Sequence, residues 1–128
     1  MVIDTSALVA IERLENDAEA LIAAIERSDV QPHISAVSLV EAGLVLSPSE
    51  FEALLADIRD FRAVIVNFTA HLAYLAIDAA HRYGKGRGKR AQLNFGDCCS
   101  YATAKALGMP LLFKGGDFTH TDIKSVPV

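Results

Sequence analysis

The sequence predicts an α/β fold in which a mostly parallel central sheet carries helices on both faces. Short β-branched segments alternate along the chain with longer segments whose apolar residues recur at helical spacing. Strands separated by helices pair in parallel, and near-continuous apolar runs are typical of strands covered on both faces. With 128 residues, 52% of them hydrophobic, the chain has the size and the apolar content of one domain, so we expect a single domain over residues 1–128.

Apolar runs mark the predicted strands. They cover residues 2–3, 30–35, 63–68, 109–113 and 125–128. The run AVIVNF at 63–68 is the clearest strand because it is β-branched and bounded by polar residues. The segment 30–35 is a weaker prediction because Pro32 cannot donate a hydrogen bond to a ladder. Residues 125–128 are expected at an edge of the sheet.

Helices are predicted between these strands from apolar spacing and capping residues. They cover residues 6–14, 16–29, 35–46 and 70–84, a segment that opens at Ser47, and a segment from near Asp97 to Gly108. Asn16, Ser35 and Thr69 are the expected N-caps, and Gly84 ends the helix that Thr69 begins. The sequence SPSE at 47–50 is typical of a capping box with proline at the first helical position. Its helix carries Phe51, Leu54, Leu55 and Ile58 on one face, either as core or as a partner surface.

The charge of the chain is acidic overall and basic in one place. Sixteen acidic and twelve basic residues give a formal net charge of −4, which argues against a protein that coats nucleic acid by bulk electrostatics. The segment HRYGKGRGKR at 81–90 nevertheless concentrates cations in a predicted Gly-rich loop. They are Arg82, Lys85, Arg87, Lys89 and Arg90.

Neither a membrane span nor a zinc site is expected. No stretch approaches the roughly 18 consecutive apolar residues of a span, and Asp4 and Glu12 do not fit a signal peptide, so we expect a cytoplasmic protein. The only cysteines, Cys98 and Cys99, are adjacent and have no second pair. We expect both to be reduced core residues.

Four acidic residues lie at strand ends, at a helix start or within an apolar helix. Asp4 follows the first strand, and Asp117 follows the strand at 109–113 after two glycines. Asp97 begins a helix, and Glu41 lies within an otherwise apolar one. Ligand crevices of parallel sheets lie at the carboxyl ends of the strands. Carboxylates that converge there repel one another and need a cation, and an all-oxygen cluster suits Mg²⁺ or Mn²⁺.

Each of these acids also has a purely structural interpretation. Asp97 and Asp4 are possible helix caps, Asp117 a turn residue, and Glu41 a partner for an arginine. The sequence alone leaves both interpretations open.

The acidic positions lie in motifs that resemble a known family. The segments MVIDTSALVA, LNFGDCCSYATAKALG and PLLFKGGDFTHTDI, together with Glu41, look like the successive motifs of a PIN-domain ribonuclease of the VapC toxin class. The resemblance covers essentially the whole chain, in order. It implies a PIN-like three-layer α/β/α sandwich.

The resemblance implies a Mg²⁺- or Mn²⁺-dependent endoribonuclease that acts as the toxin of a toxin–antitoxin pair. It assigns Asp4 and Asp97 as direct metal ligands, and Glu41 and Asp117 as ligands that bind directly or through water. Ser6 matches a hydroxyl position that holds the first acid or a bound water, although it also fits an N-cap. The implied partners are a VapB-like antitoxin, an RNA substrate and a second copy of the chain.

The basic segment then has two interpretations. Its five cations either contact RNA phosphates, with Tyr83 as a stacking surface for a base, or form a solvated loop. Of the four histidines only His120, three residues after Asp117, is expected near the site, and we expect it to have a surface role.

Two rival functions remain open. One is a non-catalytic PIN-like binding module, which has no reason to bind a metal ion at the acids. The other is a phosphohydrolase with Asp4 as nucleophile, but that chemistry usually places a second aspartate two residues later, where this chain has Ser6.

Overall fold

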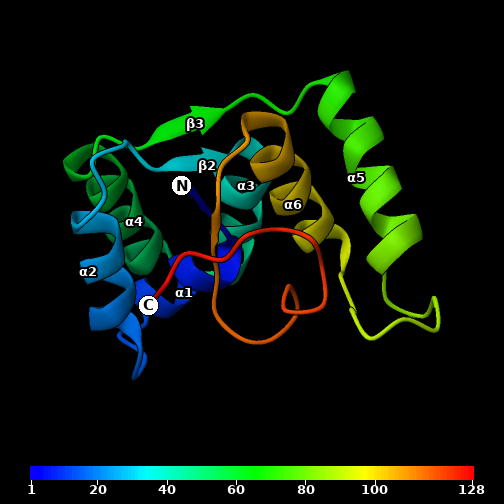
Figure 1. Ribbon diagram of the computed structural model, residues 1–128. Coiled ribbons are helices and arrows are strands. Elements are labelled where there is room, and N and C mark those ends of the chain that lie inside the picture. Colours follow the sequence, from blue (N-terminus) through cyan, green and yellow to red (C-terminus); the bar gives the residue numbers. More distant parts are fainter.

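The computed structural model describes residues 1–128 as six helices around a four-stranded sheet (Figure 1). The strands are β1 (Val2–Ile3), β2 (His33–Ser35), β3 (Val64–Val66) and β4 (Leu111–Leu112). The helices are α1 (Thr5–Glu12), α2 (Ala18–Glu26), α3 (Ala36–Val45), α4 (Pro48–Asp60), α5 (Ala70–Tyr83) and α6 (Phe95–Leu107).

All neighbouring strands of the sheet are parallel, in the order β3-β2-β1-β4. In the central strand β1, Val2 pairs with His33 of β2 on one side and with Leu111 of β4 on the other. The first and last strands of the chain are therefore neighbours, and the segments that follow them emerge at the same edge of the sheet. This arrangement confirms the predicted α/β class.

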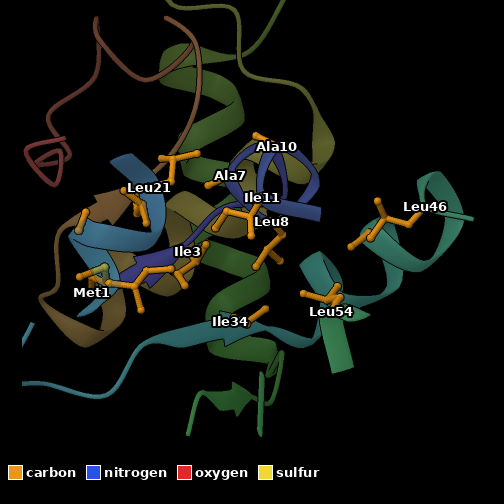
Figure 2. Close-up of a cluster of buried hydrophobic side chains, with 14 residues drawn as sticks. Met1, Ile3, Ala7, Leu8, Ala10, Ile11, Leu21, Ile34, Leu46 and Leu54 are labelled. Atoms are coloured by element: carbon orange, nitrogen blue, oxygen red, sulfur yellow. The ribbon is translucent and has the colours of Figure 1, made fainter. Parts of the chain in front are cut away.

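Side chains of the sheet enter two separate hydrophobic clusters, one on each face. Ile3 and Leu112 belong to a cluster with residues of α1, α2, α3 and α4, part of which is shown in Figure 2. Val2 and Leu111 belong to a second cluster with residues of α5 and α6. Because successive strand residues point to opposite faces, β1 and β4 supply both clusters. The helices therefore cover both faces, as the sequence predicts.

The strands are shorter and more exposed than the sequence predicts. The expected strand at 125–128 is reduced to one bridge between Leu111 and Ser125, since Pro127 has no N–H to continue the ladder. In β3, Val64 and Ile65 are 38% and 36% exposed, because this strand lies at the edge of the sheet.

Most of the predicted caps are confirmed, and one is wrong. The side chains of Ser35 and Thr69 cap α3 and α5, and Ser47 forms the capping box of α4 with Glu50. Asn16 does not cap α2. That helix begins at Ala18 after Asp17, which makes no side-chain capping bond and instead lies 3.1 Å from the Lys114 ammonium.

The face of α4 predicted as core or as a partner surface is mostly core. Leu54 is 1% exposed, and Phe51 and Ile58 pack against the first cluster. Only Leu55, at 45%, is substantially exposed. None of the six helices combines the length and the apolar character needed to cross a membrane.

Candidate active site

Asp4 lies at the carboxyl end of β1, where its side chain is only 2% exposed. Its Oδ2 accepts hydrogen bonds from the N–H of Ser6 at 2.9 Å and from the Ser6 hydroxyl at 2.6 Å. Oδ2 of Asp4 therefore caps α1, as the helix-cap interpretation predicts. The other oxygen, Oδ1, is buried without any hydrogen-bond partner. A buried carboxylate oxygen that lacks a partner is costly, so capping alone does not account for Asp4.

Ser6 connects Asp4 to the segment that follows β4. Its hydroxyl donates to Asp4 and accepts the backbone N–H of Lys114 at 3.0 Å. The Lys114 ammonium in turn pairs with Glu15 and Asp17 in the turn between α1 and α2. Ser6 thus fixes both the Asp4 carboxylate and the start of the loop that carries Asp117.

Asp97 lies in the first turn of α6, where its side chain is 8% exposed. Its Oδ2 accepts the N–H of Asn94, and the N–H of Asp97 donates to Asn94 Oδ1, both at 2.9 Å. This pair is a capping box, so α6 begins at Phe95 rather than at Asp97. Asn94 was not identified from the sequence, although its spacing of three residues from Asp97 is a usable signal.

The pKa of Asp97 links it to the other three acids. The pKa of Asp97 is raised to about 7, mainly by burial and in part by the negative charges of Asp4, Asp117 and Glu41, while the hydrogen bond from Asn94 opposes the increase. A carboxyl whose charged form is disfavoured in this way gains from a nearby cation. Asp97 therefore lies within electrostatic reach of the other three acids.

Glu41 projects from α3 towards the start of α6. A Cβ placed on Gly96 would lie 2.2 Å from Glu41 Oε2, so the carboxylate lies directly against the backbone beside Asp97. The hydroxyls of Ser38 and Ser100, buried and 3.1 Å apart, join the same two helices. Glu41 forms no salt bridge, so the interpretation as an arginine partner is wrong.

Asp117 lies in the exposed loop after β4. Gly115 has a φ of 92°, which a residue with a side chain rarely adopts, and Thr119 closes the following turn by donating to the Gly116 carbonyl. Asp117 itself makes no salt bridge in this turn.

The four acids converge without forming a preformed metal cage. No three His, Cys, Asp or Glu side chains, as they stand, are close enough together to hold a metal ion. The arrangement instead concentrates negative charge around an unpaired oxygen of Asp4 and the buried carboxyl of Asp97.

The basic segment 81–90 begins in the last turn of α5, which carries Arg82, and continues into the predicted loop between α5 and α6, here called the basic loop. Its five cations differ in their surroundings. Arg82 pairs with Asp78 and Asp122. Lys85 and Arg87 line an apolar groove between α5 and the start of α6, whereas Lys89 and Arg90 line a separate polar hollow. Cys98 and Cys99 are buried and unpaired, as the sequence predicts.

Comparison with known proteins identifies the family. The PIN domain profile matches residues 1–124. The chain is 47% identical to ribonuclease VapC30 of Mycobacterium tuberculosis over 130 residues, which cover 98% of each chain. It is 43% identical to VapC ribonuclease Mb0625 of Mycobacterium bovis over 128 residues, covering 97% of this chain and 96% of that protein. The chain therefore belongs to the PIN domain family, among the VapC proteins.

Solved structures agree on the fold. The crystal structure of VapC20 from Mycobacterium tuberculosis, described as a sarcin–ricin loop cleaving toxin, aligns with a TM-score of 0.78 at 20% identity, covering 99% of this chain and 98% of that one. A toxin–antitoxin complex from Klebsiella pneumoniae aligns with a TM-score of 0.71 at 19% identity, covering 94% and 92%.

Proposed function

We propose that this protein is a metal-dependent endoribonuclease that acts as the toxin of a toxin–antitoxin pair, with one PIN domain over residues 1–128. The observation that carries the proposal is the buried, unpartnered Oδ1 of Asp4, together with an Asp97 carboxyl whose pKa Asp4, Glu41 and Asp117 help to raise. The ribonuclease names of relatives at 43–47% identity support RNA as the substrate class. The description of VapC20 as a sarcin–ricin loop cleaving toxin also supports RNA as the substrate class.

The four acids suit Mg²⁺ or Mn²⁺, since every donor is a carboxylate oxygen and no thiol or imidazole is among them. Asp4 and Asp97 would hold the ion directly, and Glu41 and Asp117 directly or through water. A bound divalent ion supplies a water of lowered pKa and neutralises charge on the phosphoryl oxygens.

The residues around the acids position them. Ser6 holds Oδ2 of Asp4 and leaves Oδ1 free, and Asn94 holds one oxygen of Asp97 in the same way. Each acid thereby keeps one oxygen for a ligand. Gly96 leaves room for the carboxylate of Glu41 beside the backbone of α6.

RNA is a polyanion, and an acidic site repels it. The exposed cations Arg82, Lys85, Arg87, Lys89 and Arg90 offset this repulsion by contacting phosphates. Neutralising Arg87, Lys89 and Arg90 together is expected to weaken RNA binding and to flatten its salt dependence. An unchanged slope of log affinity against log salt concentration contradicts this role.

The partners we propose are a VapB-like antitoxin and a second copy of the chain. The structural neighbour from Klebsiella pneumoniae is a toxin–antitoxin complex, which supports an antitoxin. Large apolar side chains on α3 and α5 are exposed, among them Leu44 at 82% and Tyr74 at 74%. Exposed apolar side chains of this size are typical of surfaces that a partner covers.

Cleavage of total cellular RNA by the purified protein tests the proposal. The wild type and Asp4→Asn are compared in Mg²⁺, in Mn²⁺ and in EDTA. We expect discrete fragments from the wild type with either metal, and none in EDTA or from the variant. If folded, antitoxin-free wild type cuts nothing under any condition, a non-catalytic binding module is the better interpretation. A phosphoenzyme trapped on Asp4 would instead indicate the aspartate-nucleophile mechanism.

A further inference from the structure

A polar hollow of about 580 Å³ lies between the end of α5, the basic loop and the C-terminal loop. His81, Arg82 and Tyr83 line it from α5, Lys89 and Arg90 from the basic loop, and His120 from the loop that carries Asp117. Figure 1 shows these loops at the same end of the molecule. The hollow therefore joins segments that are distant in the sequence.

No carboxylate is among the residues that line this hollow, although the chain as a whole has a net charge of −4. Arg82 is already paired, with Asp78 at 3.6 Å and Asp122 at 3.8 Å. Lys89 and Arg90 have no ion-pair partner. The hollow thus offers two uncompensated positive charges.

The other polar groups of the hollow are suited to donate hydrogen bonds. The Tyr83 hydroxyl accepts a bond from Arg82 at 2.9 Å, which leaves its own hydrogen to donate. Each imidazole, of His81 and of His120, has at least one N–H in any protonation state. A concave set of donors with two free cations matches a phosphate group, whose oxygens accept several hydrogen bonds and carry charge.

The position of the hollow relates it to the acidic site. His120 lies three residues after Asp117, so one loop contributes to both places. We propose that this hollow binds an RNA phosphate other than the scissile one, and that Lys89, Arg90, His81 and His120 are its ligands. This inference rests on the proposed ribonuclease function. The bound group is either an internal phosphodiester or a terminal phosphate of the strand.

The basic loop itself provides a matched control. Lys85 and Arg87 lie only a few residues before Lys89 and Arg90 and are also exposed, but they line the apolar groove between α5 and α6. Replacing either pair removes two positive charges from the same loop. Any difference between the two double variants therefore reports on the hollow rather than on net charge.

Calorimetric titration of short oligoribonucleotides in EDTA tests the proposal without cleavage. The probe is a ribotetranucleotide with a 5′-phosphate, compared with the same sequence ending in a 5′-hydroxyl. We expect Lys89→Ala/Arg90→Ala to weaken binding by about tenfold or more. Lys85→Ala/Arg87→Ala, which removes two charges that attract the RNA but do not line the hollow, is expected to weaken binding by only about threefold. His120→Ala, on the loop that carries Asp117, is expected to weaken binding several-fold.

The outcomes distinguish a terminal from an internal phosphate, and they test phosphate binding separately from the proposed nuclease activity. Loss confined to the 5′-phosphorylated probe identifies a terminal phosphate, and equal loss for both probes identifies an internal phosphodiester. Unchanged binding by Lys89→Ala/Arg90→Ala, or equal losses in both double variants, overturns the inference. Since no cleavage is measured, a protein that passes this test and still fails to cut RNA refutes only the nuclease proposal.

Discussion

The carboxylate of Glu41 lies against the backbone of Gly96, the residue directly before Asp97. A Cβ on Gly96 would approach Oε2 to 2.2 Å and Oε1 to 2.5 Å, distances that no real contact tolerates. The absence of a side chain at this position is therefore what allows α3 to deliver its acid to the start of α6.

We expect Gly96→Ala to fold well and to lose activity. Alanine favours a helix over glycine by about 1 kcal/mol, and the atom in the way is the end of a flexible side chain, so stability should be nearly unchanged. The new methyl group displaces the Glu41 carboxylate, and RNA cleavage should fall about as far as in Glu41→Gln. Rates of RNA cleavage and thermal melting of both variants measure this.

The double variant Gly96→Ala/Glu41→Gln serves as the control for this explanation. If the methyl group acts through Glu41, the double variant is no less active than Glu41→Gln alone. Additive losses contradict the explanation.

Ser6→Ala should affect both stability and activity. The hydroxyl is the donor to Asp4 Oδ2 and the acceptor for the Lys114 N–H, so its removal leaves a partly buried N–H unpaired. We expect a loss of about 1–3 kcal/mol in the free energy of unfolding, measured by urea denaturation. A variant with wild-type stability shows that water replaces the hydroxyl at no cost.

Glu12 is expected to make stability depend on pH. Burial, together with the nearby Asp57 and Glu50, raises the pKa of Glu12 to about 7. The folded state therefore binds a proton more tightly than the unfolded one, whose glutamate has an ordinary pKa near 4.5. The stabilising contribution is complete below pH 4.5 and disappears as the pH rises through about 7.

Glu12→Gln should remove this dependence and stabilise the protein above pH 7, with little effect below pH 4.5. Unfolding free energies across this pH range measure it. Glu52→Gln, which removes the same charge from an exposed position on α4, is the matched control and should have a much smaller effect. Equal effects of the two changes indicate net charge as the cause.

Asp122 connects the C-terminal loop to α5 and α6. It accepts hydrogen bonds from Tyr101 at 2.5 Å and Lys105 at 2.6 Å, and these bonds, together with Arg82, lower its pKa to about 2. Its stabilising contribution is present above pH 3.8, the ordinary value, and declines as the pH falls towards 2. Asp122→Asn should lower the melting temperature at pH 7 by a few degrees.

The exposed pair of Asp60 with Arg59 provides the comparison for Asp122. Asp60→Asn breaks an ion pair whose side chains are 69% and 75% exposed, and such surface pairs contribute little to stability. Melting of both variants at pH 7 distinguishes a loop-anchoring role from the loss of any surface charge.

The fold class and the positions of the four acids could be predicted from local patterns. β-branched runs between amphipathic segments define parallel strands, and parallel topology sends Asp4 and Asp117 to one edge of the sheet. The acid at position 41 stood out because its helix is otherwise apolar. These inferences need only periodicity and chain order.

The features that could not be predicted from the sequence arise from contacts between segments that are distant in the chain. Nothing local indicates that Ser38 and Ser100 meet, or that Gly96 makes room for Glu41. Nor does the sequence indicate that Lys114, nearly a hundred residues away, forms an ion pair with Asp17 just before α2, a helix that no side chain caps. The basic loop likewise looks uniform in sequence. In the structure Lys85 and Arg87 line one groove, and Lys89 and Arg90 line a separate hollow.

Asp4, Glu41, Asp97 and Asp117 are proposed to act as one metal site, and calorimetric titration with Mn²⁺ tests this proposal most directly. We predict saturable binding to the wild type, weakened at least about tenfold in Asp4→Asn and unchanged in Lys89→Ala/Arg90→Ala. Absence of saturable binding to the folded wild type, or equally tight binding by Asp4→Asn, would contradict the account.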